Sequence, residues 1–375
     1  MKKTICIADT QLYTVNGGGQ VFVSSLVDNL SKSYNIIYIG DREKILNCKE
    51  CTTIKPLKNF FYKLEINKRH ILAKGIEKLC FRIPTLSKII IKKIDLNCDI
   101  IISNSITDYL TLKRNGNLRY KAAIIIKHHP YYKFNEKYPD FIINEKKYII
   151  FALNYEDLNL LKKRYDNNVN ILKLGVISDK KDKISPPKGA DFYKDKSIIF
   201  SIGRLSEKQK RFSLGIEAFS IIANRYKNLI YAIAGTGPDM KRYAKLAKKL
   251  GIQEKVRFLG FISDEEKNWF LKNSKIVLQT SEKENQSIVL IEALNKGAVT
   301  LSTSNASSEF LIKDNLNGFL TPYKKEDIAQ SLEKILKLDK SVLNKVSNNA
   351  IKSVKDFTAA NLRSGIIRAI NKLLD

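Results

Sequence analysis

Short apolar segments alternate with amphipathic segments along most of the chain. The apolar segments are rich in Ile, Leu and Val and are too short to be helices, which predicts buried strands. They cover residues 4–8, 34–40, 99–103, 122–126, 148–153, 170–175, 197–203, 229–235, 256–260, 275–280 and 298–303. Segments with helical periodicity follow many of them, as after residue 211. This alternation predicts parallel α/β sheets.

A polar and charged stretch near the middle of the chain, residues 177–196, contains Pro186, Pro187 and Gly189. This composition is typical of a linker between compact units. The 375 residues of the chain are enough for two domains with separate cores. We therefore expect one domain over residues 1–180 and a second over residues 181–355.

The overall composition is that of a globular protein, with 44% hydrophobic and 28% charged residues. The longest apolar runs fall far short of the ~20 residues of a membrane span. Asp9 and Gln11 interrupt the apolar start of the chain, so it predicts a strand and not a signal peptide. We expect a cytoplasmic protein. The five cysteines fit a reducing compartment, and Cys48 and Cys51 lack a second pair that would complete a zinc site.

The formal net charge of +28 indicates an anionic partner, which could be nucleic acid, acidic lipid or an acidic acceptor, although a lysine-rich proteome would have the same effect. The segment Tyr62–Lys93 interleaves lysines and arginines with apolar residues. A helix of this kind can lie on the inner face of an anionic membrane. The alternative is a pair of helices packed on the sheet with solvated lysines.

The stretch from residue 275 to 297 predicts a strand, a polar loop and a helix. Ser287 is a plausible N-cap, and Gly297 closes the helix. In parallel α/β sheets, ligands bind where loops leave the carboxyl ends of strands, and a helix N-terminus there favours anions. Glu284 on the loop and Glu292 on the helix could accept hydroxyl groups. Anion and polyol together describe a nucleotide sugar, whereas two surface glutamates beside a core helix are the alternative.

Cations and glycines follow other predicted strands. Arg204 and Lys210 come after the strand at 197–203, where two cations suit a diphosphate, unless the loop is simply solvated. Gly235 and Gly237 follow the next strand. Gly17, Gly18 and Gly19 precede Gln20 after the first strand, without the spacing of a dinucleotide fingerprint. His128 and His129, two of only three histidines, end the strand at 122–126.

Two glutamates with seven residues between them, followed by Ala-Leu and Gly, resemble the signature of retaining glycosyltransferases of the GT-B fold, family 4. Other elements similar to that family occur in its order: G-G-x-Q at residues 17–20, G-R-L…K at 203–210, G-x-G-P at 235–238 and N-G-F-L at 317–320. The resemblance implies two Rossmann-like α/β domains facing a central cleft. It also implies an acceptor-binding amino-terminal domain and a last helix, residues 356–375, that packs back on it.

The resemblance further implies a role for each matching residue. The catalytic group would be His128, Glu284, Lys210 and Arg204. The donor-binding group would be Gly18, Gly19, Arg204, Lys210, Gly235, Gly237, Phe258, Asn285, Gln286, Ser287, Ile288 and Glu292. Gly17, Gln20 and His129 would lie on the acceptor side. The choice between His128 and His129 stays open, and Lys208 would replace Lys210 if the loop is shifted.

We therefore expect a retaining hexosyltransferase that uses a nucleoside diphosphate sugar, most simply a UDP sugar, without a metal or other cofactor. The acceptor would be a cell-surface glycan, a lipid-linked saccharide or a teichoic-acid-type chain, and no nucleic acid is expected. One departure is that Asn285, Gln286 and Ser287 replace the family's Gly-Phe-Gly, which limits the freedom of this loop. A GT-B-like epimerase and a basic nucleic-acid- or membrane-binding protein are the alternatives.

Overall fold

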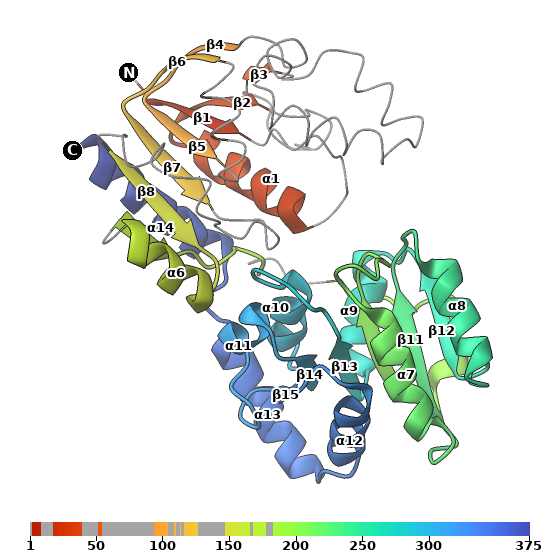
Figure 1. Cartoon of the computed structure of the whole chain (residues 1–375). Helices are drawn as coiled ribbons and strands as arrows, with labels where there is room; N and C mark the ends of the chain where they lie inside the picture. Colours follow the sequence, from red (N-terminus) through yellow and green to blue (C-terminus); the bar gives the residue numbers. More distant parts are fainter. Residues whose placement is uncertain are drawn as a thin grey trace. The chain divides into compact units, whose positions relative to one another are not determined.

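The computed structural model describes residues 2–8, 18–39, 52–54, 94–103, 109, 113, 116–126, 147–165, 168–177 and 183–375. The chain divides into two compact units, which are described separately (Figure 1). The first comprises Met1–Gly175 together with Ala359–Asp375, and the second comprises Val176–Thr358.

The first unit is built on a seven-stranded parallel sheet of order β3-β2-β1-β5-β7-β8-β9. Its strands are β1 (Thr4–Ala8), β2 (Asn35–Ile39), β3 (Thr52–Ile54), β5 (Ile100–Ser103), β7 (Ala122–Ile126), β8 (Tyr148–Ala152) and β9 (Val169–Ile171). A separate parallel pair joins β4 (Ile94–Asn97) to β6 (Gly116–Arg119). Every residue of β7 is buried, as expected for a central strand covered on both faces.

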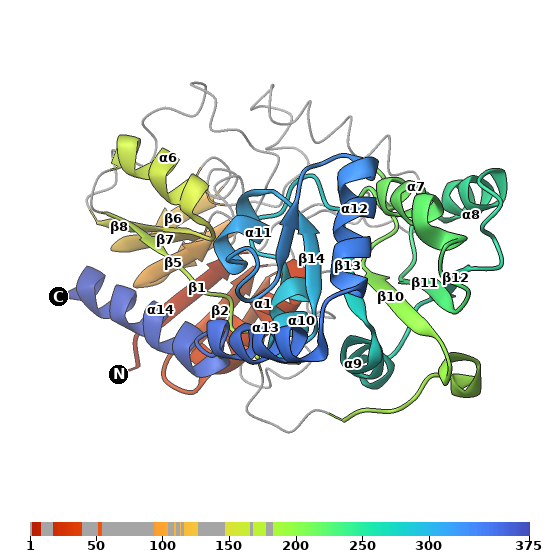
Figure 2. The same cartoon turned by 90° about the horizontal axis from the view of Figure 1, so that it is seen from below.

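Three described helices pack on this sheet: α1 (Gly18–Ser31), α6 (Tyr155–Tyr165) and α14 (Ala359–Leu374). The last helix, α14, packs against β7, β8 and α1 (Figure 2). It buries Leu362, Ile366 and Ile370. Its Arg363 donates a hydrogen bond from Nη2 to Ser33 Oγ at 2.8 Å. The end of the chain therefore completes the first unit, although it follows the second unit in sequence.

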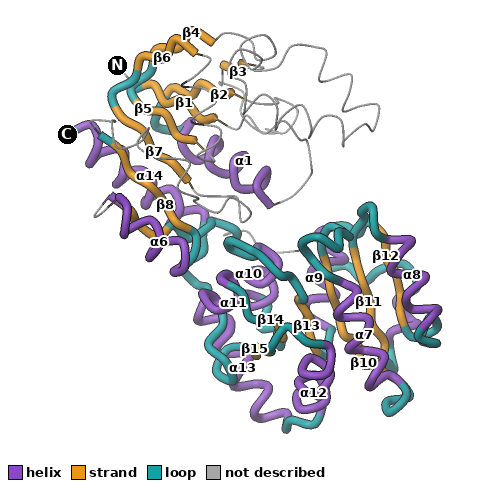
Figure 3. The backbone as a smooth tube through the Cα atoms, viewed as in Figure 1, coloured by secondary structure: helices purple, strands orange, loops and turns teal. Residues whose placement is uncertain are grey.

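The second unit contains a six-stranded parallel sheet of order β12-β11-β10-β13-β14-β15. Its strands are β10 (Ser197–Ile202), β11 (Leu229–Ala234), β12 (Val256–Gly260), β13 (Ile276–Gln279), β14 (Thr300–Thr303) and β15 (Phe319–Thr321). Its helices are α7 (Phe212–Ala223), α8 (Met240–Lys249), α9 (Asp264–Asn273), α10 (Ile288–Asn295), α11 (Ala306–Leu311), α12 (Lys325–Leu336) and α13 (Lys340–Ser353) (Figure 3).

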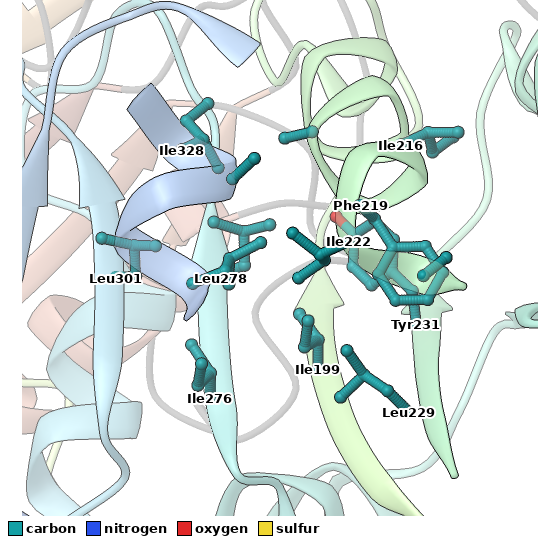
Figure 4. Close-up of a cluster of buried hydrophobic side chains, with 14 of the residues drawn as sticks. Ile199, Ile216, Phe219, Ile222, Leu229, Tyr231, Ile276, Leu278, Leu301 and Ile328 are labelled. Carbon is teal, nitrogen blue, oxygen red and sulfur yellow. The ribbon is translucent and has the colours of Figure 1, made fainter. Parts of the chain in front are cut away.

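The core of the second unit lies on both faces of its sheet. On one face, side chains of β10, β11, β13 and β14 meet α7 and α12, as Figure 4 shows for Ile199, Phe219, Leu278 and Ile328. On the other face, Phe200 stacks on Phe270 of α9, with ring centroids 4.9 Å apart. Because both faces are covered, the strands read in the sequence as continuous apolar runs.

Among the parts of the second unit that differ from the sequence-based expectation are the stretch 177–196 and helix α9. The stretch 177–196 is not linker throughout, because Ala190–Tyr193 forms a 3₁₀ helix and Tyr193 packs against Trp269 and Phe270. Helix α9 has no counterpart among the expected elements. It begins at a capping box in which Ser263 and Glu266 each bond to the other's backbone N–H.

Several expectations concern residues that the structure leaves undescribed, including Tyr62–Lys93, Cys48, Cys51 and Cys80. Cys6 and Cys98 are buried free thiols. Within the described ranges, no helix combines the length and the apolar character needed to cross a membrane.

Candidate functional site

Two loops of the second unit leave the same edge of its sheet. Strands β10 and β13 are parallel neighbours, paired at Ile199 with Ile276 and at Phe200 with Val277 (Figure 3). The loop after β10 therefore starts beside the loop after β13, at the carboxyl ends of both strands. We name residues 203–211 the basic loop and residues 280–287 the acidic loop. Ligands of parallel α/β sheets bind at this edge.

The basic and acidic loops bring Lys210 and Glu284 together. Lys210 Nζ lies 2.5 Å from Glu284 Oε1, and the two side chains are 18% and 10% exposed. Lys208, the alternative to Lys210, is exposed. The structure thus places the cation and the carboxylate that the sequence singled out in one partly buried contact, although they are 74 residues apart in the chain.

Further hydrogen bonds join the backbones of the two loops. Glu282 N donates to the carbonyl of Gln209 at 3.0 Å. Thr280 Oγ1 lies 3.0 Å from the carbonyl oxygens of both Lys210 and Arg211. The positions of Lys210 and Glu284 therefore depend on each other through the backbone as well as through their charges.

Gly235 and Gly237 hold the loop after β11 close to the basic loop. Gly235 has φ +119°, and a Cβ there would lie 1.9 Å from the carbonyl oxygen of Gly203. A Cβ on Gly237 would lie 2.3 Å from the carbonyl oxygen of Leu205. Only glycine permits both approaches. Arg204 lies between the two approached residues, and its side chain is exposed.

Helix α10 begins at the end of the acidic loop, as the sequence predicts. The N-cap Ser287 Oγ accepts a hydrogen bond from Leu290 N at 3.3 Å and lies 2.7 Å from Gln279 Oε1. Its own backbone N–H donates to Ser307 Oγ at 2.7 Å. Gly297 ends the helix with φ +66°. The positive end of the α10 dipole therefore lies next to the segment that carries Glu284.

The second glutamate, Glu292, has a partner that the sequence did not reveal. Lys267 Nζ of α9 lies 2.9 Å from Glu292 Oε1 and 2.7 Å from Asp264 Oδ1. Burial lowers the pKa of Lys267, but the two carboxylates outweigh it and raise that pKa above its usual value. Lys267 was missed because α9 was missed, and the capping box at Ser263 was the signal that could have located it.

The acidic loop lacks the glycines that the family resembled by this sequence has at the corresponding positions. Asn285, Gln286 and Ser287 are buried, at 7%, 6% and 3% exposure. Among the described residues, the non-glycine positions with positive φ are Arg211 and Asn315, so no residue of this loop adopts that conformation. The backbone therefore has no local need for glycine here.

The remaining candidate residues are placed differently or lie outside the described residues. Gly18, Gly19 and Gln20 lie in the first turn of α1. Phe258 is on β12 and packs against the apolar core. Gly17, His128 and His129 are among the residues that the structure does not describe.

Two parallel α/β units define the GT-B class of fold, and the paired cation and carboxylate at a strand edge suit a phosphorylated, hydroxyl-rich ligand. Residues 182–353 match the family model of glycosyl transferases group 1. The chain is 30% identical over 190 residues to the uncharacterised glycosyltransferase MJ1607 of Methanocaldococcus jannaschii, covering 50% of this chain and 48% of that protein. It is 29% identical over 304 residues to MJ1059 of the same organism, covering 72% of each.

Among solved structures, the fold is similar to that of Anabaena Alr3699/HepE, crystallised in complex with UDP and glucose. The TM-score is 0.69 at 14% identity, over 99% of this chain and 100% of that chain. By family match, relatives and fold, the chain resembles group 1 glycosyltransferases (EC 2.4) and has the GT-B fold.

Proposed function

We propose that the protein transfers a sugar from a nucleoside diphosphate sugar to a glycan acceptor, with retention of configuration and without a metal. The observation that carries this proposal is the contact of Lys210 with Glu284 beside the start of α10. The diphosphate of the ligand binds to positive charge, and its sugar hydroxyls donate hydrogen bonds to a carboxylate a few ångströms away. This contact supplies both groups at one place.

Each side chain then has a distinct role. Lys210, Arg204 and the N-terminus of α10 neutralise the negative charge that builds on the departing diphosphate. Lys210 exchanges its contact with Glu284 for a phosphate oxygen, which frees the Glu284 carboxylate to accept hydrogen bonds from sugar hydroxyls. Glu292, oriented by Lys267, accepts hydrogen bonds from the ribose. In the retaining reaction, the departing phosphate takes the proton of the acceptor hydroxyl.

We propose a UDP sugar as the donor. The support is the similarity in fold to a protein whose structure contains UDP and glucose. For the acceptor we propose a cell-surface glycan, a lipid-linked saccharide or a teichoic-acid-type chain. The support is the net charge of +28, which favours an anionic acceptor or membrane surface on the cytoplasmic side. A role for His128 and membrane contact through Tyr62–Lys93 stay predictions from the sequence.

A donor panel and one substitution test the proposal. Thermal shifts with UDP-, GDP- and ADP-sugars identify the nucleotide sugar that the protein binds, and release of UDP with and without acceptor separates transfer from epimerisation. Lys210→Ala should lower the transfer rate by about 10²–10³-fold with the fold intact, since removal of one preorganised hydrogen-bond donor from an active site typically costs this much. The exposed Lys241 on α8 provides the control Lys241→Ala, which should keep the wild-type rate. Near-normal turnover of purified Lys210→Ala would show that the assigned role is wrong.

A further inference from the structure

Arg211 has an unusual backbone conformation directly beside Lys210. Its φ of +51° and ψ of +43° are left-handed, and it occupies the N-cap of α7 without capping the helix through its side chain. This conformation costs free energy in any residue other than glycine. A glycine here would avoid that cost, so the contacts of the arginine side chain must account for its presence.

The guanidinium of Arg211 contacts three elements of the second unit. Its Nε and Nη2 donate to Glu282 Oε2 of the acidic loop at 3.1 and 2.9 Å. Its Nη1 lies 3.9 Å from Glu207 Oε1, and its centre lies 5.8 Å from the ring centroid of Tyr323, after β15. The hydrogen bond to Glu282 is the main cause that raises the pKa of Arg211.

The carboxylates that hold Arg211 are themselves anchored. Glu207 accepts a hydrogen bond from Ser213 Oγ, and its backbone N–H donates to Asp239 Oδ2 at 2.8 Å. The backbone N–H of Glu282 donates to Gln209. Arg211 thus links the basic loop to the acidic loop through its side chain. It is adjacent to Lys210 in the basic loop, and its partner Glu282 is two residues before Glu284 in the acidic loop.

We propose that Arg211 is a positioning residue, which holds Lys210 and Glu284 at the spacing that lets one nucleotide sugar contact both. The proposal rests on the proposed function, because it assumes that Lys210 binds phosphate and Glu284 binds sugar. A free nucleotide uses the cations and Glu292 but not Glu284, whereas the nucleotide sugar also needs the correct distance between Lys210 and Glu284. Loss of Arg211 therefore weakens the binding of the nucleotide sugar more than the binding of the free nucleotide.

The test is Arg211→Gly, which removes the guanidinium and relieves the left-handed backbone. The probes are UDP and the nucleotide sugar that gives the largest shift in the donor panel. We expect the dissociation constant of UDP to stay within about twofold, while kcat/KM for the nucleotide sugar falls about 10- to 100-fold, as for a misplaced reactive group. The midpoint of thermal unfolding should stay within about 4 °C of wild type, because strain relief offsets the lost exposed ion pair.

Glu282→Gln approaches the same contact from the other loop and guards against misfolding of the first variant. It should lower kcat/KM in the same direction, and the double variant should lose little more than Arg211→Gly, since the two residues act through one contact. Arg211→Lys keeps the charge but not the forked hydrogen-bond donors, so its kcat/KM for the nucleotide sugar should lie between the values of wild type and Arg211→Gly. The matched control is Arg225→Ala, which removes another Arg–Glu pair of the second unit, with Glu333 at 2.8 Å, and should leave both constants unchanged.

Two results would overturn the positioning role: wild-type kcat/KM in Arg211→Gly and Glu282→Gln, or an equal loss of UDP and nucleotide-sugar binding. The outcome with Lys210→Ala separates the two proposals. If Lys210→Ala is inactive and Arg211→Gly is normal, the proposed function stands and the positioning role fails. If Lys210→Ala is active, the proposed function itself fails.

Discussion

The approach of Gly235 to Gly203 allows a sharp prediction for Gly235→Ala. Gly235 has φ +119°, a conformation that L side chains rarely adopt, and its N–H donates to the carbonyl of Gly260 at 2.6 Å. An added Cβ would lie 1.9 Å from the carbonyl oxygen of Gly203 and 2.9 Å from its carbonyl carbon. These are backbone atoms, so the clash cannot be relieved by a side-chain rotation. The loop that carries Arg204 must move by about 1 Å or more to reach a normal van der Waals contact.

The free energy of unfolding should fall by two contributions. The unfavourable backbone conformation costs about 1–3 kcal/mol, and forcing an extra carbon into a packed site costs about 1–3 kcal/mol. A central value of about 4 kcal/mol for the sum corresponds to a decrease of about 8–16 °C in the unfolding midpoint for a unit of this size. At temperatures below the unfolding midpoint, transfer activity should also fall at least about tenfold. The reason is that displacement of Arg204 reduces the electrostatic stabilisation of the departing diphosphate.

The control for Gly235→Ala is Gly251→Ala, and scanning calorimetry is the assay. Gly251 also has a positive φ, +69°, but a Cβ there meets nothing within 4 Å. It should lose only about 1 kcal/mol, the cost of the backbone conformation alone. The difference between the two variants therefore reports the close approach to Gly203 together with the more unusual φ of Gly235. Equal unfolding midpoints for the two variants would refute the reasoning.

Two further predictions concern ion pairs. Lys267→Met removes the cation beside Glu292 and should weaken UDP binding about tenfold, the value of one hydrogen bond to a charged group; an unchanged dissociation constant by calorimetry would mean that Glu292 needs no orientation by Lys267. Hydrogen bonds from Lys121 Nζ and Thr4 N lower the pKa of Asp99, so this carboxylate stabilises the fold above its unfolded pKa of about 3.9 and loses that effect as the pH falls through its folded pKa. Asp99→Asn should thus be less stable than wild type in urea at pH 7 and equally stable at the acid end, whereas a difference independent of pH would contradict this origin.

Much of the fold follows from the sequence because both faces of each sheet are covered. Fully buried strands such as β7 and β11 appear as uninterrupted apolar runs, and their bounds agree with the expectation within a residue or so. Helix α9 was not expected, because acidic residues fill its first turn and its apolar face is short. The 3₁₀ helix at Ala190–Tyr193 was hidden in a polar stretch, since Tyr193 packs on Trp269 and Phe270, which are distant in sequence.

The candidate site could be predicted only as far as local order reaches. The N-cap at Ser287 and the loop positions of Lys210 and Glu284 follow from strand, loop and helix signals in sequence. The pairing of Lys267 with Glu292 and of Arg211 with Glu282 depends on neighbouring strands and helices meeting in space. No spacing along the chain encodes such contacts, so the sequence alone could not reveal them.

The second unit is an insertion in the first, and this has a consequence for biosynthesis. The chain enters it at Val176 and leaves it at Thr358, and Ile177 N donates to the carbonyl of Phe357 at 2.9 Å, so its two ends are neighbours. All of its residues emerge from the ribosome before α14 does. The second unit can fold during translation, while the sheet of the first unit stays uncovered over β7 and β8 until α14 has been made. A stop codon placed before α14 would therefore harm the first unit, although it removes none of that unit's strands.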